Sequence, residues 1–213
     1  MIHIEEESSI MKILFSPTSP YVRKCMVTAM ELGVDAQITL LPSNAHPVNR
    51  DRDIIAVNPL GKVPTFFTDD GQVLYDSRVI CEYLNDLFKG SLFPSTGRER
   101  WTTLTLQSLG DGMLDAALLS RYEDVARPEG LKWVQCRAGQ IDKIDTSLQA
   151  LNAKPELLDN RLDIGSITIG CALWYLDLRF PELNWRERYP QVAAWYATYS
   201  QRPATLASWA LPA

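Results

Sequence analysis

The apolar pattern of this 213-residue chain changes once, after Phe93-Pro94, and the change limits the folds that the chain can adopt. Before this point, short runs of strand length alternate with stretches whose apolar residues recur at helical spacing. After it, the periodicity stays helical and no further strand pair follows. We therefore predict an α/β domain followed by an all-α domain. The expected boundaries are an acidic extension at 1–11, the α/β domain at 12–88, a linker at 89–94 and the all-α domain at 95–213.

The first domain should follow the order βαβ and then ββα. Pro20 follows a Ser-Pro-rich break and opens a helical pattern, as proline does in a first helical turn. Asp70-Gly71 supplies the positive φ that a hairpin turn needs, so the strands around it should be antiparallel neighbours. Ser77 is predicted to cap the last helix of this domain. Strands are expected at 12–15, 36–41, 63–67 and 72–75, and helices at 20–33 and from Ser77 to about 89.

Proline residues divide the second domain into four predicted helices. Proline removes a backbone donor, so it marks helix boundaries. At the start of the third helix, Asp163 can accept amide hydrogen bonds as the cap, and Ser166 can return one. The predicted helices are Trp101 to before Pro128, Leu131 to Leu151, Asp163 to about Phe180, and Tyr189 to about Arg202.

Composition and charge exclude several classes of function. The net charge of −5 offers no basic surface for a polyanion, so nucleic acid is not an expected partner. No apolar run approaches the roughly 20 residues that span a bilayer, and the acidic start does not resemble a signal peptide, so a cytoplasmic protein without a membrane partner is predicted. The cysteines are widely separated and only two histidines accompany them, so neither a metal site nor a disulfide framework is expected. Each cysteine is predicted to be a small buried residue: Cys25, Cys81, Cys136 and Cys171.

Ser19 is the first candidate functional residue. It stands directly before Pro20, so it should cap the helix that begins there. The positive end of the helix dipole and the serine hydroxyl would both stabilise a thiolate placed at this position. Helix capping alone also explains a serine here.

Two further segments can bind a peptide ligand. A cis bond before Pro64 would leave the N–H and C=O of Val63 free to pair with an extended peptide, although a trans proline at a strand end is also allowed. Asp76 and Ser77 offer a carboxylate, a hydroxyl and free helix N–H groups, which suit the charged ends of an amino acid. A simple helix cap is again the alternative.

These three segments together resemble the cytosolic glutathione transferases, and the resemblance extends from Lys12 to the end of the chain. It rests on Ser-Pro-Tyr-Val-Arg-Lys at 19–24, Asn-Pro-Leu-Gly-Lys-Val-Pro at 58–64 and Asp-Ser at 76–77. The resemblance implies a thioredoxin-like first domain, glutathione as co-substrate, a homodimer, and a role in detoxification by attack on small electrophiles.

The same resemblance assigns expected roles to individual residues. Val63 would pair with the cysteinyl unit of glutathione beside a cis Pro64, and Asp76 and Ser77 would hold the γ-glutamyl end. Lys62 would meet the glycyl carboxylate, although a solvated lysine in a loop is an equal alternative. A further carboxylate partner is often supplied by the loop after the second strand, and no motif chooses among His46, Arg50 and Arg52.

Ser19 occupies the position at which some family members carry a cysteine. Serine cannot form a mixed disulfide, so this substitution favours conjugation over thiol–disulfide exchange. Thr18 and Ser16 remain alternatives for the contact with the thiol, whereas Tyr21 is expected to pack. An electrophile pocket is predicted between the domains, with candidates Met113, Leu114, Ala117 and Tyr122, although core packing explains each of these residues equally well.

Three classes of function remain open from the sequence. The first is a glutathione transferase. The second is a glutathione-dependent isomerase, dehalogenase or peroxidase, which would use the same thiolate. The third is a non-catalytic binding or regulatory protein built on the same fold.

Overall fold

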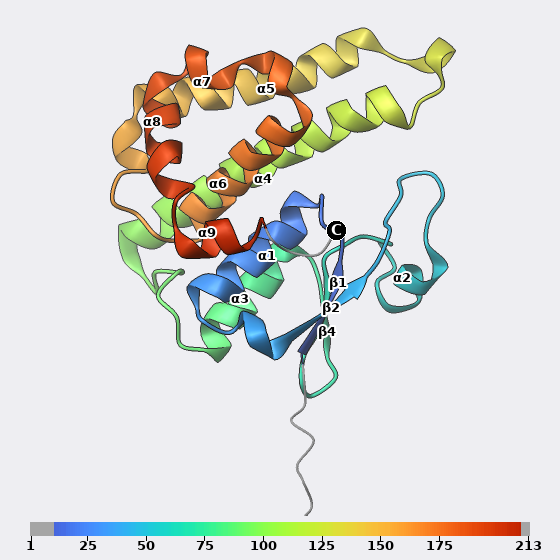
Figure 1. Ribbon diagram of the computed structural model, residues 1–213, viewed down its shortest axis with the longest axis vertical. Helices are drawn as coiled ribbons and strands as arrows, with labels where there is room; N and C mark the ends of the chain where they lie inside the picture. The colour runs from blue at the N-terminus through green and yellow to red at the C-terminus, as the bar shows by residue number, and fades with distance from the viewer. Residues whose placement is uncertain (1–10, 210–213) are drawn as a thin grey trace, which may run out of the picture.

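The computed structural model describes residues 11–209, which form a four-stranded sheet flanked by helices and a helical second domain (Figure 1). The strands lie in the order β2-β1-β3-β4, with β1 and β2 parallel and the other pairs antiparallel. This arrangement confirms the predicted strands and the hairpin. Their bounds are β1 Met11–Phe15, β2 Ile38–Pro42, β3 Thr65–Phe67 and β4 Val73–Leu74. Of the predicted extension, residues 1–10 lie outside the described residues, and Met11 begins β1.

Three α-helices accompany the sheet: α1 Pro20–Glu31, α2 Arg52–Val57 and α3 Ser77–Leu87. Figure 1 shows α1 and α3 side by side on one side of the strands and α2 on the other. The predicted cap of α3 is wrong by one residue. Asp76 is the cap, because its backbone is extended and its carboxylate accepts the N–H of Arg78 at 2.9 Å. Ser77 is the first helical residue.

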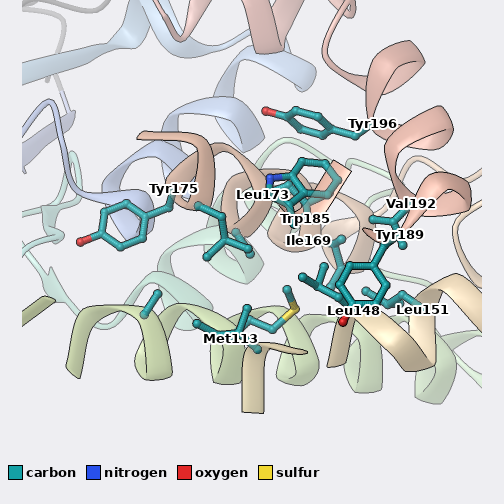
Figure 2. Packing of buried hydrophobic residues seen from close by; sticks show 14 of the residues in the cluster. Met113, Leu148, Leu151, Ile169, Leu173, Tyr175, Trp185, Tyr189, Val192 and Tyr196 are labelled. Carbon is teal, nitrogen blue, oxygen red and sulfur yellow. The ribbon is translucent and has the colours of Figure 1, made fainter. Parts of the chain in front are cut away.

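The second domain contains the four predicted helices and two short ones that the sequence did not predict, α7 and α9. The short helices escape periodicity because each spans only one turn or slightly more. Figure 2 shows the core between the long helices, where Met113 faces Leu148 and Ile169. The bounds are α4 Gly97–Val125, α5 Val134–Ala153, α6 Ile164–Arg179, α7 Trp185–Arg188, α8 Pro190–Tyr199 and α9 Pro203–Ala207.

The predicted exchange of hydrogen bonds at the start of α6 is confirmed. Asp163 Oδ1 accepts the N–H of Ser166 at 2.9 Å, and the N–H of Asp163 donates to Ser166 Oγ at 3.0 Å. The second oxygen of Asp163 accepts the hydroxyl hydrogen of Thr103 at 2.7 Å. The cap therefore also ties α6 to α4, the pair of helices that forms the centre of the second domain.

Helix α1 packs against both domains. Arg23 is buried and donates to the backbone carbonyls of Thr205 at 3.2 Å and Ser208 at 3.1 Å. Arg202 forms two hydrogen bonds to the Glu31 carboxylate at the other end of α1, at 2.7 and 2.9 Å. These contacts fix the last described helix, α9, against the helix that carries Ser19. No helix within residues 11–209 is long and apolar enough to cross a membrane.

Candidate functional site

The strand registers bring the three predicted ligand-binding segments to one end of the sheet. β1 runs antiparallel to β3 with Leu14 opposite Thr65, so the turn that leaves β1 toward Ser19 lies beside the chain that enters β3. β4 runs antiparallel to β3 with Leu74 opposite Phe66, so the chain leaving β4 reaches the same end. Ser19, Val63-Pro64 and Asp76-Ser77 are therefore neighbours in space, although up to 58 positions separate them in the sequence.

Ser19 caps α1 as predicted. Its Oγ accepts the N–H of Val22 at 3.3 Å, and its own N–H donates to the carbonyl of Ser16 at 3.1 Å. A hydroxyl that accepts one hydrogen bond keeps its hydrogen free to donate another. In the described part of the chain that hydrogen has no acceptor. A thiolate sulfur at the start of α1 would supply one.

The peptide bond between Val63 and Pro64 is cis, as the resemblance implied. Within residues 11–209, neither the N–H nor the C=O of Val63 makes a hydrogen bond. Asn58 holds this loop from beneath: its buried side-chain amide donates to the carbonyl of Lys62 at 3.2 Å and to Thr65 Oγ1 at 2.9 Å. The backbone groups of Val63 are therefore presented on a fixed loop and are free to pair with a ligand.

Gly61 and Arg50 shape the outer side of the same loop. Gly61 has φ +62°, a left-handed conformation that glycine adopts without strain, and a Cβ there would lie 3.0 Å from the Arg50 guanidinium. Arg50 itself donates to the carbonyl of Pro59 at 2.8 Å. Of the three basic residues that the sequence left open, Arg50 thus supports the loop. Lys62 is exposed, and its side chain makes no ion pair within the described residues.

The start of α3 offers both signs of charge to a ligand. Ser77 is buried, with 2% of its surface exposed, and stands in the first turn, where backbone N–H groups have no intrahelical acceptor. Asp76 caps the helix and lies 3.4 Å from the guanidinium of Arg78. A carboxylate would be bound by the N–H groups and the Ser77 hydroxyl, and an ammonium by Asp76.

A buried ion pair behind this site was missed by the sequence analysis. Lys24 Nζ lies 2.7 Å from Asp111 Oδ1, with Lys24 wholly buried and the Asp111 side chain 5% exposed. Burial alone would lower the pKa of the Lys24 ammonium, but the Asp111 carboxylate outweighs it and the pKa is raised. Asp111 Oδ2 lies 3.5 Å from Arg78 Nε. The pair therefore joins α1 and α4 to the start of α3.

The hydroxyl of Tyr21 is directed to α4, in agreement with the prediction that this side chain packs. Its hydroxyl donates to Asp115 Oδ1 on α4 at 2.5 Å. Burial and the hydrogen bond to Asp115 raise the pKa of Tyr21 strongly. The phenol therefore stays protonated at neutral pH and serves as a hydrogen-bond donor between the domains.

Three of the four residues proposed to line an electrophile pocket belong to the core instead. Met113, Leu114 and Ala117 are each at most 1% exposed, because they pack in one core cluster with residues of α5 and α6. Figure 2 shows Met113 of this cluster facing Leu148 of α5 and Ile169 of α6. Tyr122 is half-buried. A surface hollow lined by Tyr83, Asn85 and Phe93 lies along α3 and contains none of the six predicted site residues.

Three of the four cysteines are buried as predicted. Cys25 and Cys81 lie with their sulfur atoms 3.9 Å apart between α1 and α3, and burial raises the pKa of Cys25. Burial likewise raises the pKa of Cys171 to about 12. Cys136 on α5 is half-buried. Residues 11–209 contain no cluster of His, Cys, Asp or Glu that suits a metal ion.

Comparison with known proteins places this arrangement in one family. Residues 18–87 match the glutathione S-transferase N-terminal domain, and residues 134–198 match the C-terminal domain. Together with the thioredoxin-like sheet and the helical second domain, these matches show that the chain belongs to the glutathione S-transferase family.

Individual relatives support this assignment. The chain is 32% identical over 179 residues to the uncharacterized GST-like protein YibF of Escherichia coli, covering 82% of this chain and 86% of YibF. A crystal structure of a glutathione transferase family member from Pseudomonas fluorescens Pf-5 with bound glutathione superposes with a TM-score of 0.91 at 46% identity, covering 93% and 98% of the two chains. Elongation factor 1-gamma of Danio rerio is 24% identical over 84% of this chain and 41% of its own length.

Proposed function

We propose that the protein is a glutathione transferase that activates the thiol of glutathione at Ser19 and directs it onto a small electrophile. The observation that carries this proposal is the convergence, at one end of the sheet, of three unsatisfied groups. These are the hydroxyl hydrogen of Ser19, the backbone of Val63, and the N–H groups of Ser77 and Val79 in the first turn of α3. Their chemistry matches a peptide that carries a thiol and an amino-acid end.

In the proposed complex, each part of glutathione meets a group of suitable chemistry. Val63 pairs through its backbone with the cysteinyl unit beside cis Pro64, and Asp76 and Ser77 hold the γ-glutamyl ammonium and carboxylate. Lys62 is exposed and free to reach the glycyl carboxylate. Pairing of the cysteinyl unit with Val63 then places the glutathione sulfur at the start of α1.

The proposed reaction begins with loss of the thiol proton to solvent. A free thiol has a pKa of about 8.5, and the positive end of a helix together with a donated hydrogen bond lowers it toward neutrality. The sulfur electron pair then forms a bond to an electrophilic carbon. With an aryl halide the carbon–halogen bond breaks and halide leaves. Ser19 accordingly stabilises the anion and takes no part in proton transfer.

Binding of glutathione is the direct test of this proposal. We expect the protein to be retained on immobilised glutathione and to show a saturable titration by calorimetry. Replacing Ser77 with alanine should weaken binding about tenfold or more, because one hydrogen bond to a charged group is lost. Ser108→Ala, at an exposed position on α4, is the matched control and should bind as the unmodified protein does. Absence of any saturable binding would refute the proposal.

A non-catalytic role is the second candidate, and the similarity to elongation factor 1-gamma supports it. An assay with glutathione and 1-chloro-2,4-dinitrobenzene distinguishes the two candidate functions. A transferase forms the conjugate above the uncatalysed rate, whereas a binding protein does not. An isomerase, dehalogenase or peroxidase would share the thiolate step, and product analysis with the corresponding substrates distinguishes these activities.

We also propose that the protein acts as a cytoplasmic homodimer with a role in detoxification. The four cysteines are free, which suits a compartment in which glutathione keeps thiols reduced. Sedimentation equilibrium should give about twice the chain mass of 24.0 kDa. A single species at the chain mass across the micromolar range would contradict the dimer.

A further inference from the structure

Asp115 is an exposed carboxylate that forms no ion pair with a basic side chain of residues 11–209. It lies on α4, one helical turn after Asp111, and its only partner within residues 11–209 is the hydroxyl of Tyr21 at 2.5 Å. Asp111 differs sharply, because it is buried against Lys24 and approached by Arg78. A neutral hydroxyl donor orients a carboxylate without cancelling its charge. Asp115 therefore presents a negative charge held in a defined position.

This charge lies across the domain boundary from the start of α1. Tyr21 follows Ser19 by two residues and stands in the first turn of α1, so the Tyr21 hydrogen bond holds Asp115 close to the thiol end of the proposed site. The other charged groups nearby interact with residues other than Asp115. Asp111 is paired with Lys24. Arg121 and Arg179 lie near Tyr175. Burial raises the pKa of Tyr175, and the two arginines act to lower it.

We propose that Asp115 is a specificity-determining residue, which favours electrophiles with a cationic or hydrogen-bond-donating substituent and disfavours those with a carboxylate. The inference rests on the proposed function, since it concerns the group attached to the glutathione sulfur. Tyr21 lies two residues after Ser19 and its hydroxyl is hydrogen-bonded to Asp115, so a substituent on a sulfur bound at Ser19 would lie near this exposed carboxylate. Two unit charges a few ångströms apart near a protein surface change affinity by a factor of about ten.

Binding of charged conjugates tests this inference without requiring turnover. The probes are three S-substituted glutathiones of similar size: S-(3-aminopropyl), S-propyl and S-(2-carboxyethyl). Calorimetry should show the cationic conjugate binding about tenfold more tightly than the anionic one, with the neutral conjugate between them. In Asp115→Asn this ratio should fall to about one, while the affinity for glutathione itself stays within about twofold of the unmodified protein.

Two further variants separate charge from packing. Tyr21→Phe keeps the carboxylate but removes the hydrogen bond that orients it, so the preference for the cationic conjugate should become smaller without changing direction. Asp142→Asn removes one exposed carboxylate from α5, on the far side of α4 from the sheet in Figure 1, and should leave the ratio unchanged. An equal ratio in the unmodified protein and Asp115→Asn would overturn the inference while leaving the proposed function intact. If glutathione did not bind at all, both the inference and the proposed function would be refuted.

Discussion

Replacing Lys24 with methionine should lower the free energy of unfolding by about 3–5 kcal/mol, the usual cost of leaving a buried charge without its partner. Lys24 is wholly buried and its ammonium lies 2.7 Å from Asp111. Arg78 cannot replace it, because its side chain is 57% exposed and its Nε remains 3.5 Å from the other carboxylate oxygen. Urea unfolding followed by tryptophan fluorescence and circular dichroism would measure the loss.

A double variant and a surface control make this prediction specific. Lys24→Met combined with Asp111→Leu removes both charges, so it should recover much of the lost stability, as apolar replacements of buried ion pairs do. Lys143→Met makes the same chemical change on the exposed side of α5 and should alter stability by less than about 0.5 kcal/mol. If Lys24→Met proved as harmless as Lys143→Met, the ion pair would have no part in holding the domains together.

Replacing Ser19 with alanine should reduce kcat/KM toward 1-chloro-2,4-dinitrobenzene about a hundredfold, the usual cost of removing one hydrogen bond to a developing anion. The apparent pKa of bound glutathione, read from the thiolate absorbance near 240 nm, should rise toward that of the free thiol. Binding of glutathione should change much less, because Val63 and Ser77 remain. Steady-state kinetics and a pH titration of the complex provide these measurements.

Further substitutions at this position distinguish the hydroxyl from the helix cap. Ser19→Ala also removes the acceptor for the Val22 N–H, whereas glycine at a cap position costs only a few tenths of a kcal/mol. Ser19→Gly should therefore lose activity without losing stability, and Ser19→Thr should retain both. Thr18→Ala or Ser16→Ala producing the large loss in place of Ser19→Ala would reassign the contact to the thiol.

The sequence predicted the elements that carry a local signal. Proline before a helix, Asp-Gly in a hairpin and the Asp163–Ser166 cap each depend on residues a few positions apart, and the structure confirms all three. The cap of α3 was placed one residue late because aspartate and serine are both good caps. Only the backbone decides between them, and it is extended at Asp76.

Interactions between distant segments were not predictable in this way. Lys24 and Asp111 are 87 positions apart, and a lysine within a helix does not indicate which carboxylate it will meet. For a related reason the sequence could not decide whether Met113, Leu114 and Ala117 line a pocket or belong to the core. Periodicity shows that one face of α4 is apolar, but it does not show that α5 and α6 cover that face completely.

The contacts of Arg23 have a consequence for the order in which the protein is completed during synthesis. Domains generally fold from the N-terminus as the chain leaves the ribosome. The carbonyl groups that receive the Arg23 guanidinium belong to Thr205 and Ser208, 182 and 185 residues later. The Arg23 side chain of α1 therefore cannot form these two hydrogen bonds until nearly the whole chain has been synthesised. A nascent or truncated chain would hold that guanidinium unpaired against an incomplete interface.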